Sequence, residues 1–328
     1  MKYRRMATLF LAVALVLFCA TDAFAQKAFK LGHPRPAGSP DDVALKTFAD
    51  AVAKGTNNRI RIELYPASQL GNYTVVQERV GIGDVEMQLA PFGTNVTKGL
   101  GIITIPYLVE TWDELPVVFA MDGKLMTAVS KMAEKEGLKI LALYPKYFGG
   151  IALSKMPKDP KGTGAKGLKV RVPGIKSFEK LAESLGYLAT PIAFSEAFTA
   201  WQTGIVDGVI GSGAEGYWSS FRDLTKVYLP VNTHLEMWFL YINADIYKKL
   251  SAADRKVLDD AAAELQKARF SLAPQETKSY EDMLAKNGTQ VVSFSAAELK
   301  AIADKVKAEV WPVLRKDFGA ELFDSVTK

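Results

Sequence analysis

The strongest constraint on the fold is a regular alternation of short strand-like and helix-like stretches along most of the chain. Apolar and polar residues alternate at 29–32 and 59–65, and the segment between them, 41–55, carries apolar residues at helical spacing. Further strands are predicted at 82–89, 139–143, 169–172 and 206–210, and further helices at 113–136 and 177–185. This order predicts an α/β fold with mostly parallel sheets that helices cover on both faces.

The pattern becomes almost purely helical toward the C-terminus. Ser251 precedes Asp254 by three residues, and Ser295 precedes Glu298 by three, which is the spacing of a helix-capping box. The first of these helices is predicted to run to about residue 286 and to bend at Pro274, which lies inside it. Residues 155–167, rich in Lys, Pro and Gly, are the best candidate for a surface loop between two lobes.

The N-terminus has the pattern of a secretory signal peptide. A basic start is followed by a short apolar run at 7–20 and by Ala23-Phe24-Ala25, which predicts cleavage after Ala25 and residence in the periplasm. The alternative is an uncleaved membrane anchor, although the apolar run is short for a membrane-spanning helix. A lipid anchor on Cys19 is disfavoured because Phe18 stands where a small residue is needed.

Composition excludes several classes of function. Cys19 is the only cysteine and leaves with the predicted signal, so the remaining chain can form no disulfide, thiolate nucleophile or cysteine-bound metal site. The net charge of +5 falls to about +3 when residues 1–25, with three basic residues and one acidic, are removed. The basic residues are dispersed among acidic ones, which disfavours nucleic acid as a partner and mildly favours anionic ligands.

No catalytic pattern emerges from the sequence. The chain has two histidines, His33 and His234, too few for a His-rich metal site, and it lacks a G-x-S-x-G elbow and a P-loop. G-x-G-x-x-G occurs at 162–167, after a loop, and at 211–216, where the bulky residues that follow make a poor opening for a phosphate-binding helix. We therefore expect no enzyme activity, no cofactor and no metal. His33 follows the first strand and either approaches a ligand or packs in the loop, whereas His234 is interpreted as structural.

Four short segments, in order and at familiar spacing, resemble one family. They are LYPASQLG at 64–71, KGLKVRVPG at 166–174, PIAFSEAF at 191–198 and AWQTGIVDG at 200–208. In these segments the chain is similar to the solute-binding proteins of tripartite ATP-independent periplasmic (TRAP) transporters, of the dicarboxylate-binding type. The resemblance extends along the whole chain after the predicted signal.

This resemblance implies a two-lobed binding protein that encloses a small organic anion between its lobes. The lobes would be joined by crossing strands and by a long helix that packs on both. We place lobe I at residues 27–148 and 237–276, and lobe II at 149–236 and 277–328. The implied partners are the small and large membrane subunits of a TRAP permease, and the protein is expected to be a monomer.

The resemblance also assigns roles to two side chains. Arg171 matches the family's arginine that forms a two-pronged salt bridge with the ligand's carboxylate, because a planar guanidinium offers parallel donors to a planar carboxylate. Phe194 matches the aromatic residue that packs against the ligand. The alternatives are a structural ion pair for Arg171 and an ordinary core position for Phe194.

Departures from the family pattern predict a ligand with a single negative charge. Gly150 stands where many members carry a second arginine, Gly211 stands where many carry an asparagine, and Pro91-Phe92 replace an acidic residue found in some members. A second ligand charge would then be unpaired in a closed cleft, unless Arg35 or Lys146 supplied a replacement cation. Aromatic residues that either line the cleft or belong to the core are Phe92, Tyr147, Phe148, Trp218, Trp238 and Phe239.

The class of anion stays open at this point. A small 2-oxo or hydroxy monocarboxylate fits one cation and aromatic walls. A sulfonate such as isethionate also fits if four glycines let backbone N–H groups approach it, namely Gly149, Gly150, Gly211 and Gly213. A dicarboxylate or an aromatic acid is an alternative ligand, and an exported protein that presents its ligand to a chemoreceptor is an alternative function.

Overall fold

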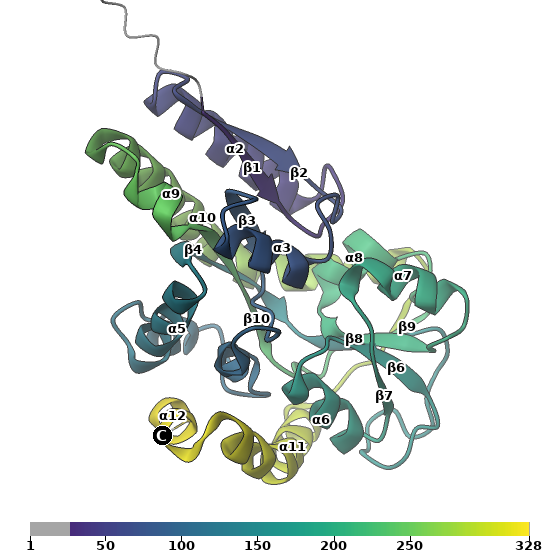
Figure 1. The fold of residues 1–328 in the computed structure, drawn as a ribbon. Coiled ribbons are helices and arrows are strands. Elements are labelled where there is room, and N and C mark those ends of the chain that lie inside the picture. Colours follow the sequence, from purple (N-terminus) through teal and green to yellow (C-terminus); the bar gives the residue numbers. More distant parts are fainter. Residues whose placement is uncertain (1–26, 328) are drawn as a thin grey trace, which may run out of the picture.

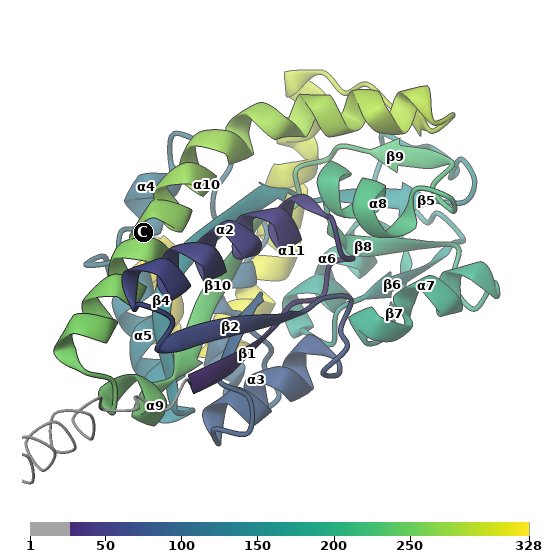
Figure 2. The ribbon, with the colours of Figure 1, turned by 90° about the horizontal axis from the view of Figure 1, so that it is seen from above.

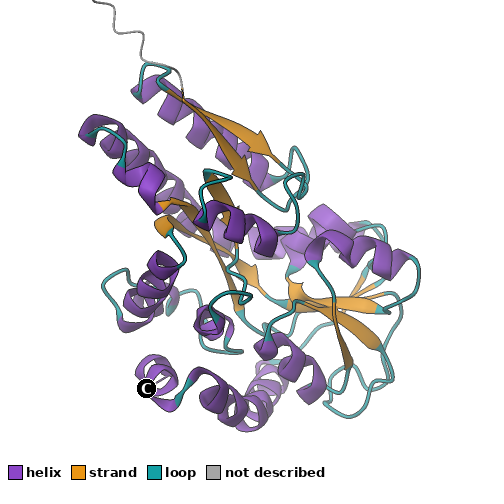
Figure 3. Ribbon diagram, in the orientation of Figure 1, coloured by secondary structure: helices purple, strands orange, loops and turns teal. Residues whose placement is uncertain are grey.

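The structure is a computed structural model that describes residues 27–327 and contains two separate β-sheets flanked by helices (Figures 1 and 3). One sheet has five strands in the order β2-β1-β3-β10-β4, and the other has six in the order β11-β9-β5-β8-β6-β7. The predicted signal peptide, residues 1–25, lies outside the described residues. The predicted α/β fold, with a sheet for each of two lobes and a long helix, is confirmed.

The five-stranded sheet is built from parallel strands joined by helices. Strands β1 (Lys27–Gly32), β2 (Ile60–Tyr65) and β3 (Met87–Ala90) are parallel, and α2 (Pro40–Gly55) and α3 (Tyr73–Gly81) connect them. Helix α2 begins at the N-cap Ser39 and buries Leu45, Phe48 and Val52 against the sheet. Strands β4 (Leu138–Phe148) and β10 (Leu235–Asn243) add to this sheet in antiparallel fashion.

The six-stranded sheet repeats this plan. Strand β6 (Lys169–Val172) pairs in parallel with β7 (Leu188–Pro191) and β8 (Gly208–Ser212), and α6 (Lys176–Ser184), α7 (Phe194–Gln202) and α8 (Ala214–Phe221) follow these strands in turn. The sheet is completed by β5 (Gly150–Leu153), β9 (Val227–Leu229) and β11 (Gln290–Val291); β5 is antiparallel to both of its neighbours. Antiparallel pairing is thus concentrated where the chain passes between the sheets.

Three connections join the two sheets. Strand β4 ends at Phe148 in the first sheet, and after Gly149 the chain enters β5 in the second; β10 carries the chain back after β9. Helix α10 (Ala252–Lys286) is the third, because it packs on β4 and α2 and also on α8 and β11 (Figure 2). Pro274 lies inside α10, as predicted. The exact residue boundaries of the two lobes stay a prediction.

Three local predictions were wrong. The helix expected at 113–136 is two helices, α4 (Leu115–Val118) and α5 (Lys124–Lys135), because Gly123 takes an extended conformation between them. The strand expected at 82–89 begins only at β3, since the chain first turns through Gly83, whose φ is +80°. The loop at 155–167 joins β5 to β6 within one sheet and therefore does not connect the two sheets.

The C-terminal helices pack mainly on other helices. Helix α11 (Ala296–Phe318) starts with the predicted capping box, in which Ser295 and Glu298 bond each other's backbone N–H groups. It packs on α6 and on the 3-10 helix η1 (Lys98–Thr104), whereas α12 (Ala320–Thr327) packs on α5. The short helix α9 (Ala244–Lys248) follows β10. Over residues 27–327, no helix combines the length and apolarity needed to cross a bilayer.

Candidate ligand-binding site

A small buried cavity lies where the two sheets face each other. Its volume is about 30 Å³, enough for one or two water molecules, since one water needs roughly 10–15 Å³. Residues from both sheets line it: Pro34, Arg35, Tyr73, Pro91, Thr104, Tyr147, Arg171, Pro173, Ile175, Phe178, Phe194, Gly211, Ser212, Glu236 and Trp238. An outer groove of about 210 Å³ shares four of these residues, including Arg171 and Phe194.

Arg171 is a buried cation on β6. Its neighbours Val170 and Val172 are fully buried in the core, and Arg171 itself is 1% exposed. The Nε atom donates to the carbonyl oxygen of Ile192 at 2.8 Å, which fixes the guanidinium plane. Among residues 27–327, no carboxylate lies within ion-pair distance of it. Burial lowers the pKa of Arg171, and Tyr73, Tyr217 and Glu236 offset only part of that effect, so an anion would be a favourable partner.

Arg35 is a second buried cation at this cavity, where the sequence offered it only as a replacement from a loop. Its Nη2 atom donates to the Tyr147 hydroxyl at 2.6 Å, whereas Nε and Nη1 have no hydrogen-bond partner within the described residues. Asp41 and Glu215 lie 3.9 and 3.8 Å away. Burial by itself would lower the pKa of Arg35, but Tyr147 and these two carboxylates raise it.

Gly216 leaves the space that the Arg35 guanidinium occupies. A Cβ atom at Gly216 would lie 2.6 Å from Nη2 of Arg35, so the last glycine of the G-x-G-x-x-G at 211–216 makes room for the guanidinium. Helix α8 does begin within this motif. However, its first turn buries Glu215 against Lys146. A carboxylate at that place repels a pyrophosphate. The glycine of the motif instead allows close packing of helix α8 against Arg35.

Aromatic rings separate and cover the two guanidinium groups. The centroid of the Phe194 ring is 5.3 Å from Cζ of Arg35 and 5.7 Å from Cζ of Arg171. The Trp238 ring lies 5.0 Å from Cζ of Arg35. These are cation–π distances, and the rings also supply apolar walls for the carbon skeleton of a ligand.

Glu236, on β10, is a cavity residue that sequence reasoning missed. Its Oε1 atom accepts from the indole Nε1 of Trp238 at 2.7 Å, and Oε2 lies 3.1 Å from Nε2 of His234. His234 does not line the cavity; it holds Glu236 and packs edge-on against Phe178, in agreement with a structural role. Residue 234 precedes β10 and residues 236 and 238 lie in it; this spacing of two groups the side chains but does not indicate that they reach a cavity.

A network of buried ion pairs lies behind the cavity. Nζ of Lys146, on β4, is 2.5 Å from Oδ2 of Asp41 on α2 and 2.8 Å from Oε2 of Glu215 on α8. These side chains are almost completely buried. The network therefore ties together helices that pack on different sheets.

The structure brings only some of the candidate residues to the cavity. Arg171, Phe194, Gly211 and Trp238 line it, as does Tyr147. The remaining candidates do not, although each was proposed from the sequence: Phe92, Phe148, Trp218, His33 and Phe239.

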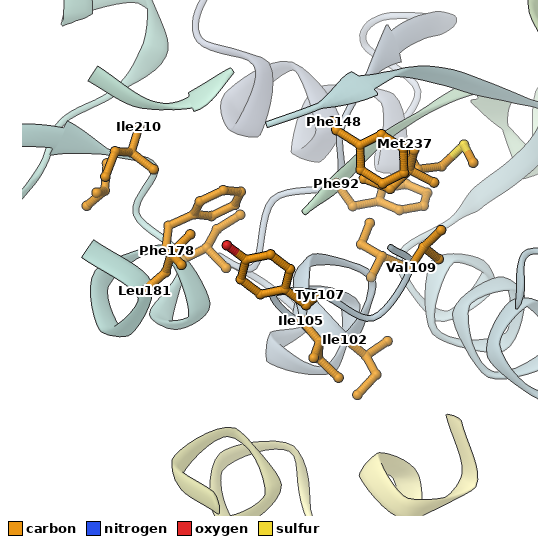
Figure 4. Packing of buried hydrophobic residues seen from close by; sticks show 14 of the residues in the cluster. Phe92, Ile102, Ile105, Tyr107, Val109, Phe148, Phe178, Leu181, Ile210 and Met237 are labelled. Atoms are coloured by element: carbon orange, nitrogen blue, oxygen red, sulfur yellow. The ribbon is translucent and has the colours of Figure 1, made fainter. Parts of the chain in front are cut away.

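These five side chains have other surroundings. Phe92 stacks on Phe239 at 4.4 Å, and Phe148 packs edge-on against Trp112, so all three phenylalanines are core residues. Figure 4 shows Phe92 and Phe148 in this core. Trp218 is partly exposed at a separate groove formed by α2, α8 and α10. The imidazole of His33 lies 3.3 Å from Asp42 and is buried, in agreement with the loop-packing alternative.

The glycines differ in their surroundings too. Gly211 lines the cavity with a φ of +105°, and a Cβ atom there would approach Pro173 to 2.8 Å, so the position requires glycine. Gly149, Gly150 and Gly213 are covered by His234, Tyr228 and Tyr147 respectively. Of the four glycines through which a sulfonate would approach the backbone, only Gly211 lines the cavity. Within 27–327, no group of acidic, histidine or cysteine side chains is placed to hold a metal ion.

Comparison with known proteins identifies the family. Residues 31–317 match the family described as bacterial extracellular solute-binding protein, family 7, or DctP. The C4-dicarboxylate-binding periplasmic protein DctP of Rhodobacter capsulatus is 26% identical over 324 residues, which cover 96% of this chain and 95% of that protein.

Two solved structures share the fold. A TRAP periplasmic solute-binding protein of Polaromonas bound to D-erythronate is 29% identical, with a TM-score of 0.81 over 92% of this chain and 98% of that one. The sugar-acid-binding protein of Advenella mimigardefordensis, in complex with galactonate, is 22% identical, with a TM-score of 0.83 over 92% and 96%. The motifs, the two-sheet fold and the family match agree. The chain therefore belongs to the DctP family of periplasmic solute-binding proteins of TRAP transporters, a family of binding proteins that are not enzymes.

Proposed function

We propose that this protein captures a small organic monoanion, with a carboxylate as the anionic group, and delivers it to the small and large membrane subunits of a TRAP permease. The observation that carries the proposal is the Arg171 guanidinium. It is buried at the cavity, is fixed through Nε, and has no carboxylate partner within the described chain. A bound carboxylate would satisfy its remaining donors in a two-pronged, charge-assisted geometry.

Several observations favour a carboxylate over a sulfonate. The tetrahedral head of a sulfonate needs donors from three directions, and the glycines that could have supplied backbone donors are covered by side chains, except Gly211. The Polaromonas relative was solved with D-erythronate, a hydroxylated monocarboxylate. The Rhodobacter relative is named for C4-dicarboxylates, which keeps a dicarboxylate as the competing candidate.

The balance of charge around the cavity supports a single negative charge on the ligand. Arg35 and Lys146 lie within 4 Å of two carboxylates, Asp41 and Glu215, which leaves Arg171 as the cavity cation without a carboxylate at ion-pair distance among the described residues. Arg35 is therefore already neutralised by its neighbours. A second carboxylate on the ligand would be desolvated without a cation of its own, which is costly in a closed site.

The expected result is a preference for monoanions of at least about tenfold, the ratio that about 1.4 kcal/mol produces. Calorimetric titration in one buffer would compare lactate, pyruvate, D-erythronate and isethionate with succinate and malate. Lactate or D-erythronate should bind at least about tenfold more tightly than succinate, and isethionate should bind less tightly than the carboxylates. Tighter binding of succinate would refute the charge argument and favour the dicarboxylate candidate.

Delivery to a permease has its own test. Neighbouring genes for one small and one large membrane protein would support transport, whereas a neighbouring chemoreceptor gene would favour ligand presentation. Because the closed cavity has room for only one or two waters, ligand entry requires the two sheets to move apart. Such hinge closure around a ligand is the expected mode of capture.

A further inference from the structure

We propose that Glu236 is the specificity residue of this site and that it selects acids carrying a hydroxyl group beside the carboxylate. This inference rests on the proposed function, because it assumes that Arg171 receives the ligand's carboxylate. It names the chemical class of the ligand as hydroxy monocarboxylates, in preference to simple, oxo or dicarboxylic acids.

Glu236 is held rigidly at the cavity wall. Trp238 donates to Oε1 at 2.7 Å and the His234 imidazole lies 3.1 Å from Oε2, so both carboxylate oxygens are fixed from the side of β10. These contacts come from residues two positions away in the chain, Trp238 on β10 and His234 just before it, and the strand is buried throughout. Only 7% of Glu236 is exposed. Side-chain freedom is therefore largely lost before any ligand binds, which favours recognition by a preformed group.

Each carboxylate oxygen of Glu236 still has capacity to accept a hydrogen bond. An ionised carboxylate offers about four lone-pair sites, and the two contacts described above occupy two of them. Within the described residues, Glu236 makes no ion pair with Arg35 or Arg171, and the carboxylates beside Arg35 are Asp41 and Glu215. The carboxylate is thus an unsaturated acceptor in a cavity that also presents two cations.

An acceptor beside an anion-binding arginine discriminates among acids by their second functional group. A hydroxyl donates to Glu236, and a hydrogen bond to a charged acceptor is among the stronger ones. A 2-oxo group can only accept, so its oxygen is repelled, and a second carboxylate is repelled more strongly. An acid with only hydrogen at that carbon displaces water from the carboxylate of Glu236 but donates no hydrogen bond in its place. This also lowers the affinity.

The test compares matched acids in wild-type protein and in Glu236→Gln. The pairs are lactate with propionate and D-erythronate with butyrate, which have equal carbon chains, and pyruvate is added as an acceptor-only acid. Wild-type protein should bind each hydroxy acid at least about tenfold more tightly than its partner. In Glu236→Gln this preference should fall to within about threefold, and pyruvate should gain affinity, because an amide N–H can donate to it.

Glu236→Gln keeps the shape of the side chain, and its amide oxygen can still accept from Trp238. Glu264→Gln, an exposed position on α10, is the matched control and should bind as wild type does. Thermal unfolding without ligand shows whether Glu236→Gln is folded, and the hydroxy-acid preference of wild-type protein tests the idea even if the variant fails to fold.

The outcomes separate this inference from the proposed function. If Glu236→Gln loses the same factor of affinity for hydroxy acids and for deoxy acids, Glu236 is a structural residue and its role in specificity is overturned. That outcome would leave acid binding through Arg171 intact. Equal binding of lactate and propionate by wild-type protein would overturn that role as well. If wild-type protein binds none of the five acids, the proposed function fails, and the role of Glu236 fails with it.

Discussion

Replacement of Arg171 by lysine is expected to lower the affinity for the ligand by about tenfold or more. Lysine keeps the charge but loses the paired, planar donors that match a carboxylate, and it cannot keep the hydrogen bond from Nε to Ile192. Arg171→Ala also removes the charge and should cost about 2–5 kcal/mol of binding free energy. Isothermal titration with the best acid from the panel above measures both effects.

Arg61→Lys is the matched control for Arg171. Arg61 lies on β2, is exposed, and donates a long hydrogen bond to Asn58, so its replacement should leave affinity unchanged. Affinity that survives in Arg171→Lys and Arg171→Ala alike would remove Arg171 from the site. The ligand's carboxylate would then have to be received by Arg35.

Replacement of Lys146 by methionine is expected to destabilise the protein by about 3–5 kcal/mol, the usual cost of removing one partner from a buried ion pair. The Lys146 side chain is 1% exposed, and those of Asp41 and Glu215 are similarly buried. Without Lys146, two buried carboxylates would share Arg35, which lies 3.9 and 3.8 Å from them. Chemical denaturation followed by circular dichroism measures the loss in the free energy of unfolding.

Two further variants make this prediction specific. Lys300→Met breaks an ion pair with Asp304 that is exposed on α11, and it should have no measurable effect on stability. Adding Glu215→Gln to Lys146→Met removes one uncompensated carboxylate and should restore part of the stability. A loss in Lys146→Met no larger than that in Lys300→Met would contradict a stabilising role for the network.

The same network predicts how stability depends on pH. Burial by itself raises the pKa of Asp41, but the charges of Lys146 and Arg35 outweigh burial and lower it below its usual value. A carboxylate with a lowered folded-state pKa contributes stability above its unfolded pKa, about 4, and this contribution is lost as pH falls through the folded-state value. Wild-type protein should therefore lose more stability below about pH 4 than Asp41→Asn does. If the free energy of unfolding fell with pH in the same way in both proteins, this linkage would be contradicted.

Much of the fold follows from local sequence patterns. The alternation of strands and helices, the helix after Ser251, and the capping box at Ser295 and Glu298 were all predicted and are present. Each depends on the spacing of residues within a few turns of helix or one strand. The break at Gly123 was missed because the apolar spacing of residues 113–136 continues across it, and only the backbone conformation of the glycine interrupts the helix.

The residues of the site also fall into those that the sequence could predict and those that it could not. Arg171 and Phe194 could be selected from short segments, because each lies in a motif at the end or start of a regular element. Arg35 and Glu236 could not, since they reach the cavity only when the loop after β1 and strand β10 meet the second sheet. Whether an aromatic ring lines a cavity or fills a core depends on which face of its element meets which neighbour.

The sequence by itself determined the α/β class, the long C-terminal helix and the family, because periodicity, caps and motifs are local properties of the chain. The tertiary structure alone decided that Phe92 and Phe148 belong to the core while Tyr147 lines the cavity. It also decided that the charge of Arg35 is balanced by Asp41 and Glu215. Burial and charge balance arise from contacts between residues far apart in the chain, and no local pattern encodes them.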